Sequence, residues 1–100
     1  MVNKSLNIRG NQDTAVDISI QALSFLAANE EILGQFVEQT GFSFDHIRSV
    51  ANTTEFRIAM LEFLLSDESV LLTFCSNTSI DPSSIQPARD NLNAILSNEL

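Results

Sequence analysis

Apolar residues recur at intervals of three and four along most of the chain, which is the spacing of a helix face. The first such stretch covers residues 15–26, and Asp13 or Thr14 is expected to cap its start. A second stretch follows Asn29, a good capping residue, and ends at Gly41, which suits the left-handed stop of a helix. No segment alternates with a period of two, so we predict no strands.

Capping residues divide the next part of the chain into three more helices. Ser43 is expected to begin a short third helix, and Asn52 with Glu55 forms a capping-box pattern for a fourth. Ser66 or Asp67 is expected to begin a fifth. Because the fourth helix is apolar on most of its sides, we expect it to be the most buried.

A last helix is predicted after Asp81 and Pro82, which combine a capping residue with the proline that a first turn prefers. Pro87 lies further on and lacks the N–H group that a helix interior needs. It therefore forces either a kink or a break into a turn and a separate helix.

The beginning of the chain has a different character. Residues 1–12 are polar and aperiodic, with Gly10-Asn11 as a breaker, so we expect a flexible N-terminal arm. The remainder, residues 13–100, is expected to form one helical domain. The sequence thus predicts an all-α fold, a compact bundle of five or six helices.

The chain also matches itself when it is shifted so that Ala22 falls on Met60, a displacement that we call the repeat offset. Segment 22–47 then lies over segment 60–85 with eight identities in 26 positions, and helix caps align as well as apolar positions. The identical pairs are Leu23/Leu61, Phe25/Phe63, Leu26/Leu64, Glu30/Glu68, Leu33/Leu71, Phe36/Phe74, Thr40/Thr78 and Ile47/Ile85. We predict two related units, at about 15–51 and 53–97, packed about a pseudo-twofold axis. The alternative is that two amphipathic hairpins converged on one Leu/Phe pattern.

Composition and charge narrow the classes of partner. A chain of 100 residues with 44% hydrophobic residues is one globular domain. Residues 13–100 contain all 13 acids and only three arginines, and the whole chain has a net charge of −8. This charge repels phosphate backbones and anionic membranes, so we expect no nucleic-acid and no membrane partner. Solubility explains the acidity, with a basic protein partner or DNA mimicry as alternatives.

The location is predicted from what the chain lacks. Its single cysteine excludes an internal disulfide, which fits a reducing compartment. The N-terminus has no apolar core of a signal peptide, and no apolar run approaches the length of a membrane span. We therefore expect a cytoplasmic protein.

Candidates for chemistry are few. His46 has no second histidine or cysteine at helical spacing, so we interpret it as a surface residue rather than a metal ligand. Cys75 falls at a core position near the end of its helix, which indicates a buried structural thiol. Arg48 and Arg57 are expected to pair with acids at helix starts. We predict no catalytic, cofactor-binding or metal-binding residue and no cofactor.

The runs FLAANEEILGQFVEQTG, IRSVA and LEFLLSDESVLLTFC, in this order, carry a resemblance to known sequences. Their combined pattern, FLA…LG.F…TG…LR..A…FLL.DE.LL.F, resembles a family of short alphaproteobacterial proteins of unknown function. The likeness covers residues from about 20 to 90. It implies an all-helical bacterial domain without an assigned activity, and it supplies no catalytic residue.

Four residues are candidates for an interaction surface. Gly34 corresponds to Leu72 in the other unit, which favours a close helix approach, with simple tolerance of the glycine or a groove floor as alternatives. Phe42 and Phe44 lie near a turn, where they cap the core or, if exposed, form a binding patch. Arg48 is a scarce cation, so it is an alternative anchor for an acidic ligand.

The preferred functional hypothesis is a small protein-interaction or regulatory module without catalytic activity. Its partner is an unknown protein or a second copy of the chain. One alternative is a small enzyme or ligand-binding domain in which His46 and Arg48 converge with an acid from the other unit. A second alternative is an acidic nucleic-acid mimic that binds a basic protein.

Overall fold

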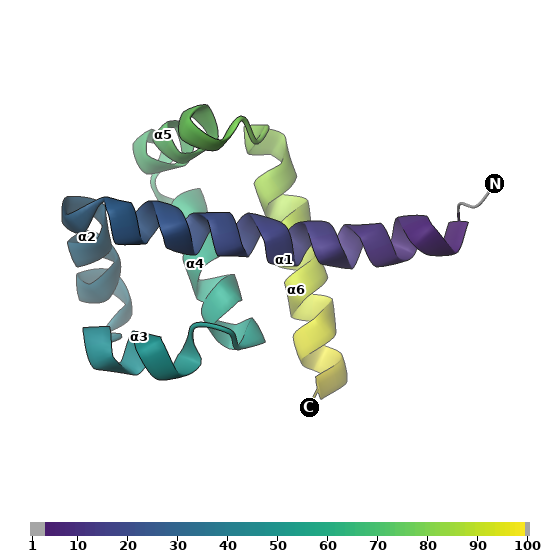
Figure 1. Cartoon of the computed structure of the whole chain (residues 1–100), viewed down its shortest axis with the longest axis horizontal. Coiled ribbons are helices and arrows are strands. Elements are labelled where there is room, and N and C mark those ends of the chain that lie inside the picture. The colour runs from purple at the N-terminus through teal and green to yellow at the C-terminus, as the bar shows by residue number, and fades with distance from the viewer. Residues whose placement is uncertain (1–3, 100) are drawn as a thin grey trace.

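Six α-helices and one 3-10 turn form the computed structural model, which describes the backbone of residues 4–99 and the side chains of residues 14–98 (Figure 1). In chain order they are α1 (Lys4–Ala28), α2 (Glu30–Thr40), α3 (Phe44–Val50), α4 (Thr54–Ser66), α5 (Glu68–Thr78), η1 (Pro82–Ser84) and α6 (Ile85–Glu99). The described residues contain no strand, so the predicted all-α bundle is confirmed. None of their helices is long and apolar enough to cross a bilayer.

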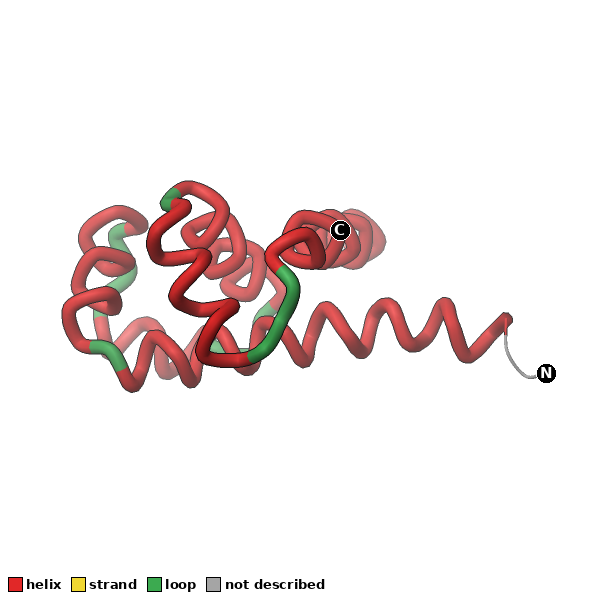
Figure 2. The backbone as a smooth tube through the Cα atoms, turned by 90° about the horizontal axis from the view of Figure 1, so that it is seen from above, coloured by secondary structure: helices red, strands yellow, loops and turns green. Residues whose placement is uncertain are grey.

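The first helix is longer than expected. α1 begins at Lys4 rather than at Asp13 or Thr14, and Gly10 lies inside it. One interior glycine costs a helix only about 1 kcal/mol, whereas each added residue contributes a further backbone hydrogen bond. The first turns of α1 extend past α6, away from the other helices (Figures 1 and 2). The expected helix start is therefore wrong. The flexibility of residues 1–12 stays a prediction, and residues 1–3 lie outside the described part.

Several helix ends lie where the sequence predicted them. The Ser43 hydroxyl accepts the backbone N–H of His46 at 3.0 Å and so caps α3. The Asp67 carboxylate accepts the N–H groups of the second and third residues of α5. Gly41 ends α2 with a φ of 82°, in the left-handed region that glycine enters without a steric penalty.

Two caps differ from the prediction. Asn29 stands at the start of α2, but its side chain caps no N–H there and instead donates to the Phe25 carbonyl at 2.7 Å. The last carbonyls of α1 have no partner within the helix, and a single residue joins α1 to α2. The side-chain amide of this residue pairs with one of these carbonyls instead of capping α2. α4 is capped by Thr53, whose hydroxyl accepts from Phe56, and not by Asn52.

Pro87 produces a break and not a kink. Asp81 caps the 3-10 turn η1, which Pro82 opens, and α6 begins separately at Ile85. Backbone and side-chain hydrogen bonds from Ser83 hold the pKa of the Asp81 carboxyl below its usual value. Pro87 is thus the third residue of α6. The N–H groups of a first turn have no intrahelical partner, so the ring costs no hydrogen bond.

α4 is the central helix of the bundle. It packs against α1, α2, α5 and α6, and α1 lies across it (Figure 1). Seven of its thirteen residues are buried, which confirms the prediction for this helix: Thr54, Phe56, Ile58, Met60, Leu61, Phe63 and Leu64. A helix that is apolar on most sides is thereby covered on most sides.

Local geometry recurs at the repeat offset. α2 and α5 begin and end at matching positions, and each is followed by a left-handed residue, Gly41 or Ser79. The hydroxyls of Thr40 and Thr78 each donate to the carbonyl one helical turn earlier, at 2.6 and 2.8 Å. These recurrences support the predicted internal duplication, which stays a prediction.

Two phenylalanine pairs join the units reciprocally. Phe25 on α1 meets Phe74 on α5 edge to face, with ring centroids 5.4 Å apart. Phe63 on α4 meets Phe36 on α2 in the same manner, also at 5.4 Å. At the repeat offset Phe25 corresponds to Phe63, and Phe74 corresponds to Phe36, so the two pairs are equivalent. Each unit therefore supplies one ring from its first helix and one from its second, and the rings cross between the units.

We expect Phe36→Ala to lower the free energy of unfolding by about 3–5 kcal/mol, because it removes a fully buried ring and leaves a cavity. Phe44→Ala is the matched control. Since Phe44 is 59% exposed, its loss should change the unfolding energy by less than about 0.5 kcal/mol. Urea denaturation followed by circular dichroism measures both. Equal costs for the two variants would contradict this packing.

Candidate functional site

The α2–α3 corner, which we define as residues 34–48, contains the four residues predicted to form an interaction surface. Phe44 is the most exposed large hydrophobic residue among the described side chains, whereas Phe42 is half-buried. Arg48 is exposed on α3, and Gly34 is exposed on α2. The corner therefore presents one open aromatic ring together with a cation.

Gly34 is not the site of a close helix approach. A Cβ atom built there would meet nothing within 4 Å. Its counterpart Leu72 is also exposed, at 48%, so both units leave this helix position open. The interpretation of Gly34 as a packing glycine is wrong, and nothing in the structure explains glycine there rather than alanine.

Phe42 attaches the turn before α3 to the core. Its ring stacks on Phe36 with centroids 6.0 Å apart and meets Phe56 edge to face at 5.2 Å. The His46 ring lies 5.2 Å from Phe42 on α3. Phe42 therefore caps the core, which was one of the two predicted alternatives. Phe44 follows the other alternative and is exposed.

A hollow of about 250 Å³ opens beside α3. It is lined by Phe42, His46, Val50, Thr53, Glu55 and Phe56. Its floor is aromatic, its rim carries one carboxylate, and its walls come from α3, the following turn and the start of α4. We call it the α3 hollow.

α3 itself is only lightly packed. None of its seven residues is buried, and Ile47 and Val50 are half-buried. These two are its apolar contacts with the core. A helix so short is marginal without tertiary packing. Its outer face, with Phe44, is thus free to meet another molecule.

The residues proposed for catalysis do not form a cluster among the described residues. His46 is exposed beside Phe42, and Arg48, two positions further along a helix, projects from a different face. The part of the chain that the structure describes contains no group of three or more His, Cys, Asp or Glu residues that could hold a metal ion.

The ion pairs differ from those expected. Among the described side chains, both pairs are made by Arg89, which contacts Glu62 at 3.4 Å and Asp90 at 2.9 Å. The predicted pairs of Arg48 and Arg57 with acids at helix starts are therefore wrong. An exposed long cation gains little from such pairing, since water screens the attraction and the side chain loses rotamer freedom.

Cys75 is a buried free thiol, as its core position predicted. Burial raises the pKa of this thiol, and the charge of Asp81 raises it further. Because the thiolate is the reactive form, both effects suppress its reactivity. Cys75 therefore belongs to the core rather than to a site.

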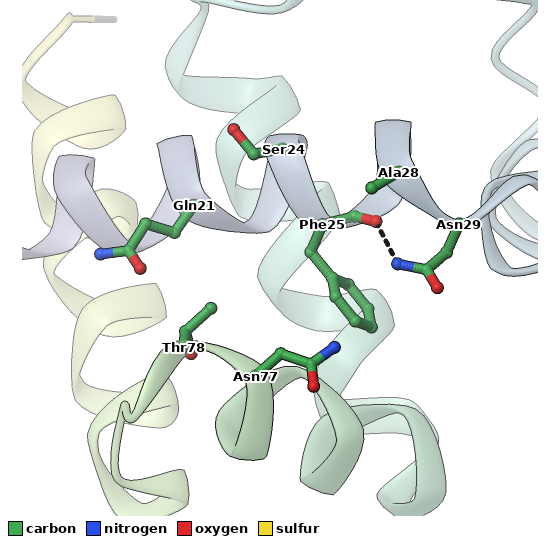
Figure 3. A pocket seen from close by; sticks show the side chains of 7 residues that line it. All are labelled: Gln21, Ser24, Phe25, Ala28, Asn29, Asn77 and Thr78. Atoms are coloured by element: carbon green, nitrogen blue, oxygen red, sulfur yellow. Dashed lines mark hydrogen bonds between the residues drawn. The ribbon is translucent and has the colours of Figure 1, made fainter.

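Sequence reasoning missed two further hollows, which lie where a first helix of one unit crosses a second helix of the other. One, of about 280 Å³, is lined by Gln21, Ser24, Phe25, Ala28, Asn29, Asn77 and Thr78 (Figure 3). The other, of about 300 Å³, is lined by Gln39, Thr40, Ala59, Glu62, Phe63 and Ser66. The repeat offset maps the first lining, apart from Asn29, onto the second, so this shift was the signal that could have found them.

These crossing hollows differ in polarity. The hollow in Figure 3 is lined by neutral amides and hydroxyls around Phe25. In its counterpart, the Gln39 amide donates to the Ser66 hydroxyl at 3.3 Å, and Glu62 is engaged by Arg89. Neither brings together a nucleophile and a base, so they are explained as gaps between crossing helices.

Comparison with known proteins identifies a matching family. The family described as Protein of unknown function (DUF3572) has a model that matches residues 12–94. This confirms the resemblance to a family without an assigned activity, while the alphaproteobacterial origin stays a prediction. No match was found among curated proteins, and none among solved structures.

We expect Gly34→Ala to raise the free energy of unfolding by about 0.5–1 kcal/mol, since alanine favours the helix and its Cβ meets open space. Gly41→Ala should instead lower it by about 1–2 kcal/mol, because a left-handed residue with a Cβ is strained. Thermal and urea unfolding measure both. A destabilised Gly34→Ala variant would show that the glycine is needed for packing after all.

Proposed function

The chain belongs to the DUF3572 family of proteins of unknown function, and we propose that it is a small cytoplasmic protein-interaction or regulatory module without catalytic activity. Its interaction surface is the α2–α3 corner. The partner is another protein, with self-association as the alternative mode of assembly.

The exposed Phe44 ring is the observation that carries this proposal. Phe44 is 59% exposed, and contact between its apolar surface and water is unfavourable. A partner that buries this surface therefore gains binding free energy. Aromatic rings are among the residue types enriched in protein interfaces. The ring projects from the lightly packed α3, none of whose residues is buried.

The surroundings of Phe44 supply a polar rim. Arg48 lies one helical turn further along α3, and Asp45 is the exposed neighbour of Phe44. Thirteen acids against three arginines in residues 13–100 give a net charge of −10, which steers basic partners toward this protein. The same charge makes like copies repel, which favours a different protein over a homodimer.

Phe44→Ser tests the proposal. We expect the wild-type chain, used as bait in lysate of its native host, to capture one protein in a fixed ratio that mass spectrometry identifies. Phe44→Ser should lose most of this protein, because the ring supplies the apolar contact. Light scattering of the bait alone reports whether the partner is a second copy.

Leu72→Ser is the matched control, since Leu72 is 48% exposed on α5. It should retain the partner. If both substitutions lose it equally, or if the wild type captures nothing beyond an acidic control protein, the α2–α3 corner is not the interaction surface.

A further inference from the structure

The α3 hollow has a closed counterpart elsewhere in the molecule. At the repeat offset, its wall residues Val50 and Thr53 correspond to Ala88 and Ala15. Val50 is half-buried and Thr53 is exposed, whereas Ala88 is 4% exposed and Ala15 is completely buried. These two wall positions are therefore covered in one unit and open in the other.

In the second unit the corresponding element is α6, which contains Ala88 and packs against the helix that carries Ala15. This helix runs on to Glu99 and packs against both α1 and α4, with α1 passing across it (Figure 1). Its inward apolar positions are Leu92, which is buried, and Ile95 and Leu96, which are half-buried. Ile95 and Leu96 follow Leu92 by about one helical turn, so the three lie on one helix face.

The first unit has no such continuation. α3 stops at Val50, and the chain turns at residues 51–53 into α4. The helix that would extend α3 over the hollow is missing, since the residues corresponding to the end of α6 are used to build α4. What fits the α3 hollow is accordingly a short helix with apolar residues at the spacing that α6 uses.

The acidic residues around the α3 hollow indicate that its occupant is positively charged. Glu55 lines the rim and is exposed, and Asp45 is exposed on α3. His46 also lines the hollow, while Arg48 projects from another face of α3. A Lys or Arg beside the apolar positions of the occupant would meet Glu55.

We infer that the α3 hollow receives a short basic amphipathic helix contributed by a partner protein, lying over Val50 and Phe56 in the place that corresponds to the continuation of α6 beyond Ala88. The inference rests on the proposed function and names the partner's binding element. Helix-in-groove recognition of this type uses anchors at i, i+3 or i+4, and i+7.

Two synthetic peptides, each long enough for about four helical turns, test this inference on the full chain. The first carries leucines at the spacing of Leu92, Ile95 and Leu96, with lysines at the polar positions. The second carries glutamates in place of the lysines. We expect the lysine peptide to shift the backbone NMR signals of His46, Val50 and Glu55, and to bind about tenfold or more tightly than the glutamate peptide.

Glu55→Lys should weaken the lysine peptide about tenfold or more, because it replaces attraction by repulsion. Glu68→Lys is the matched control, since it makes the same charge change in the first turn of α5, and it should leave the affinity unchanged. Equal affinity for both peptides, no binding, or shifts that map outside the hollow would overturn the inference.

The outcome is separable from that of the proposed function. Suppose a captured partner depends on Phe44 but is insensitive both to Glu55→Lys and to competition by the lysine peptide. Then the interaction surface stands, and the helix in the hollow is rejected. If capture depends on neither residue, both proposals fail.

Discussion

The reciprocal crossing of two phenylalanine pairs is the interaction on which the rest of this fold depends. Phe25 reaches from the first unit to Phe74, and Phe63 reaches from the second unit to Phe36, each at a centroid distance of 5.4 Å. A single helical unit of this length could not bury rings at both its first and second helices. Two units that exchange rings can, and the helices then cross instead of lying in parallel layers.

The places where this repetition fails are the ones with functional interest. α6 continues over its unit and closes it, whereas α3 ends at Val50 and leaves the α3 hollow and Phe44 exposed. The fold itself needs neither the exposed ring nor the open hollow. The proposed interaction surface therefore rests on an asymmetry between matching positions and not on a catalytic motif.

Much of the fold could be predicted, because helix spacing and capping chemistry are local properties of the sequence. Gly41 ends a helix because it lacks a Cβ atom, and Ser43 and Asp67 begin helices because their side chains accept backbone N–H groups. The start of α1 could not be predicted from its apolar pattern, since an extending helix needs no buried face to add hydrogen bonds. The α3 hollow and the exposure of Phe44 depend on where α3 sits in space, which spacing along the chain does not determine.

The account is tested most directly by double-mutant cycles on the two phenylalanine pairs, with each ring replaced by leucine. It predicts a coupling energy of about 0.5–1.5 kcal/mol within Phe25/Phe74 and a similar value within Phe36/Phe63, measured by urea unfolding. It also predicts one cooperative transition in every variant. Coupling in only one pair, or two separate transitions for the two units, would contradict the reciprocal packing.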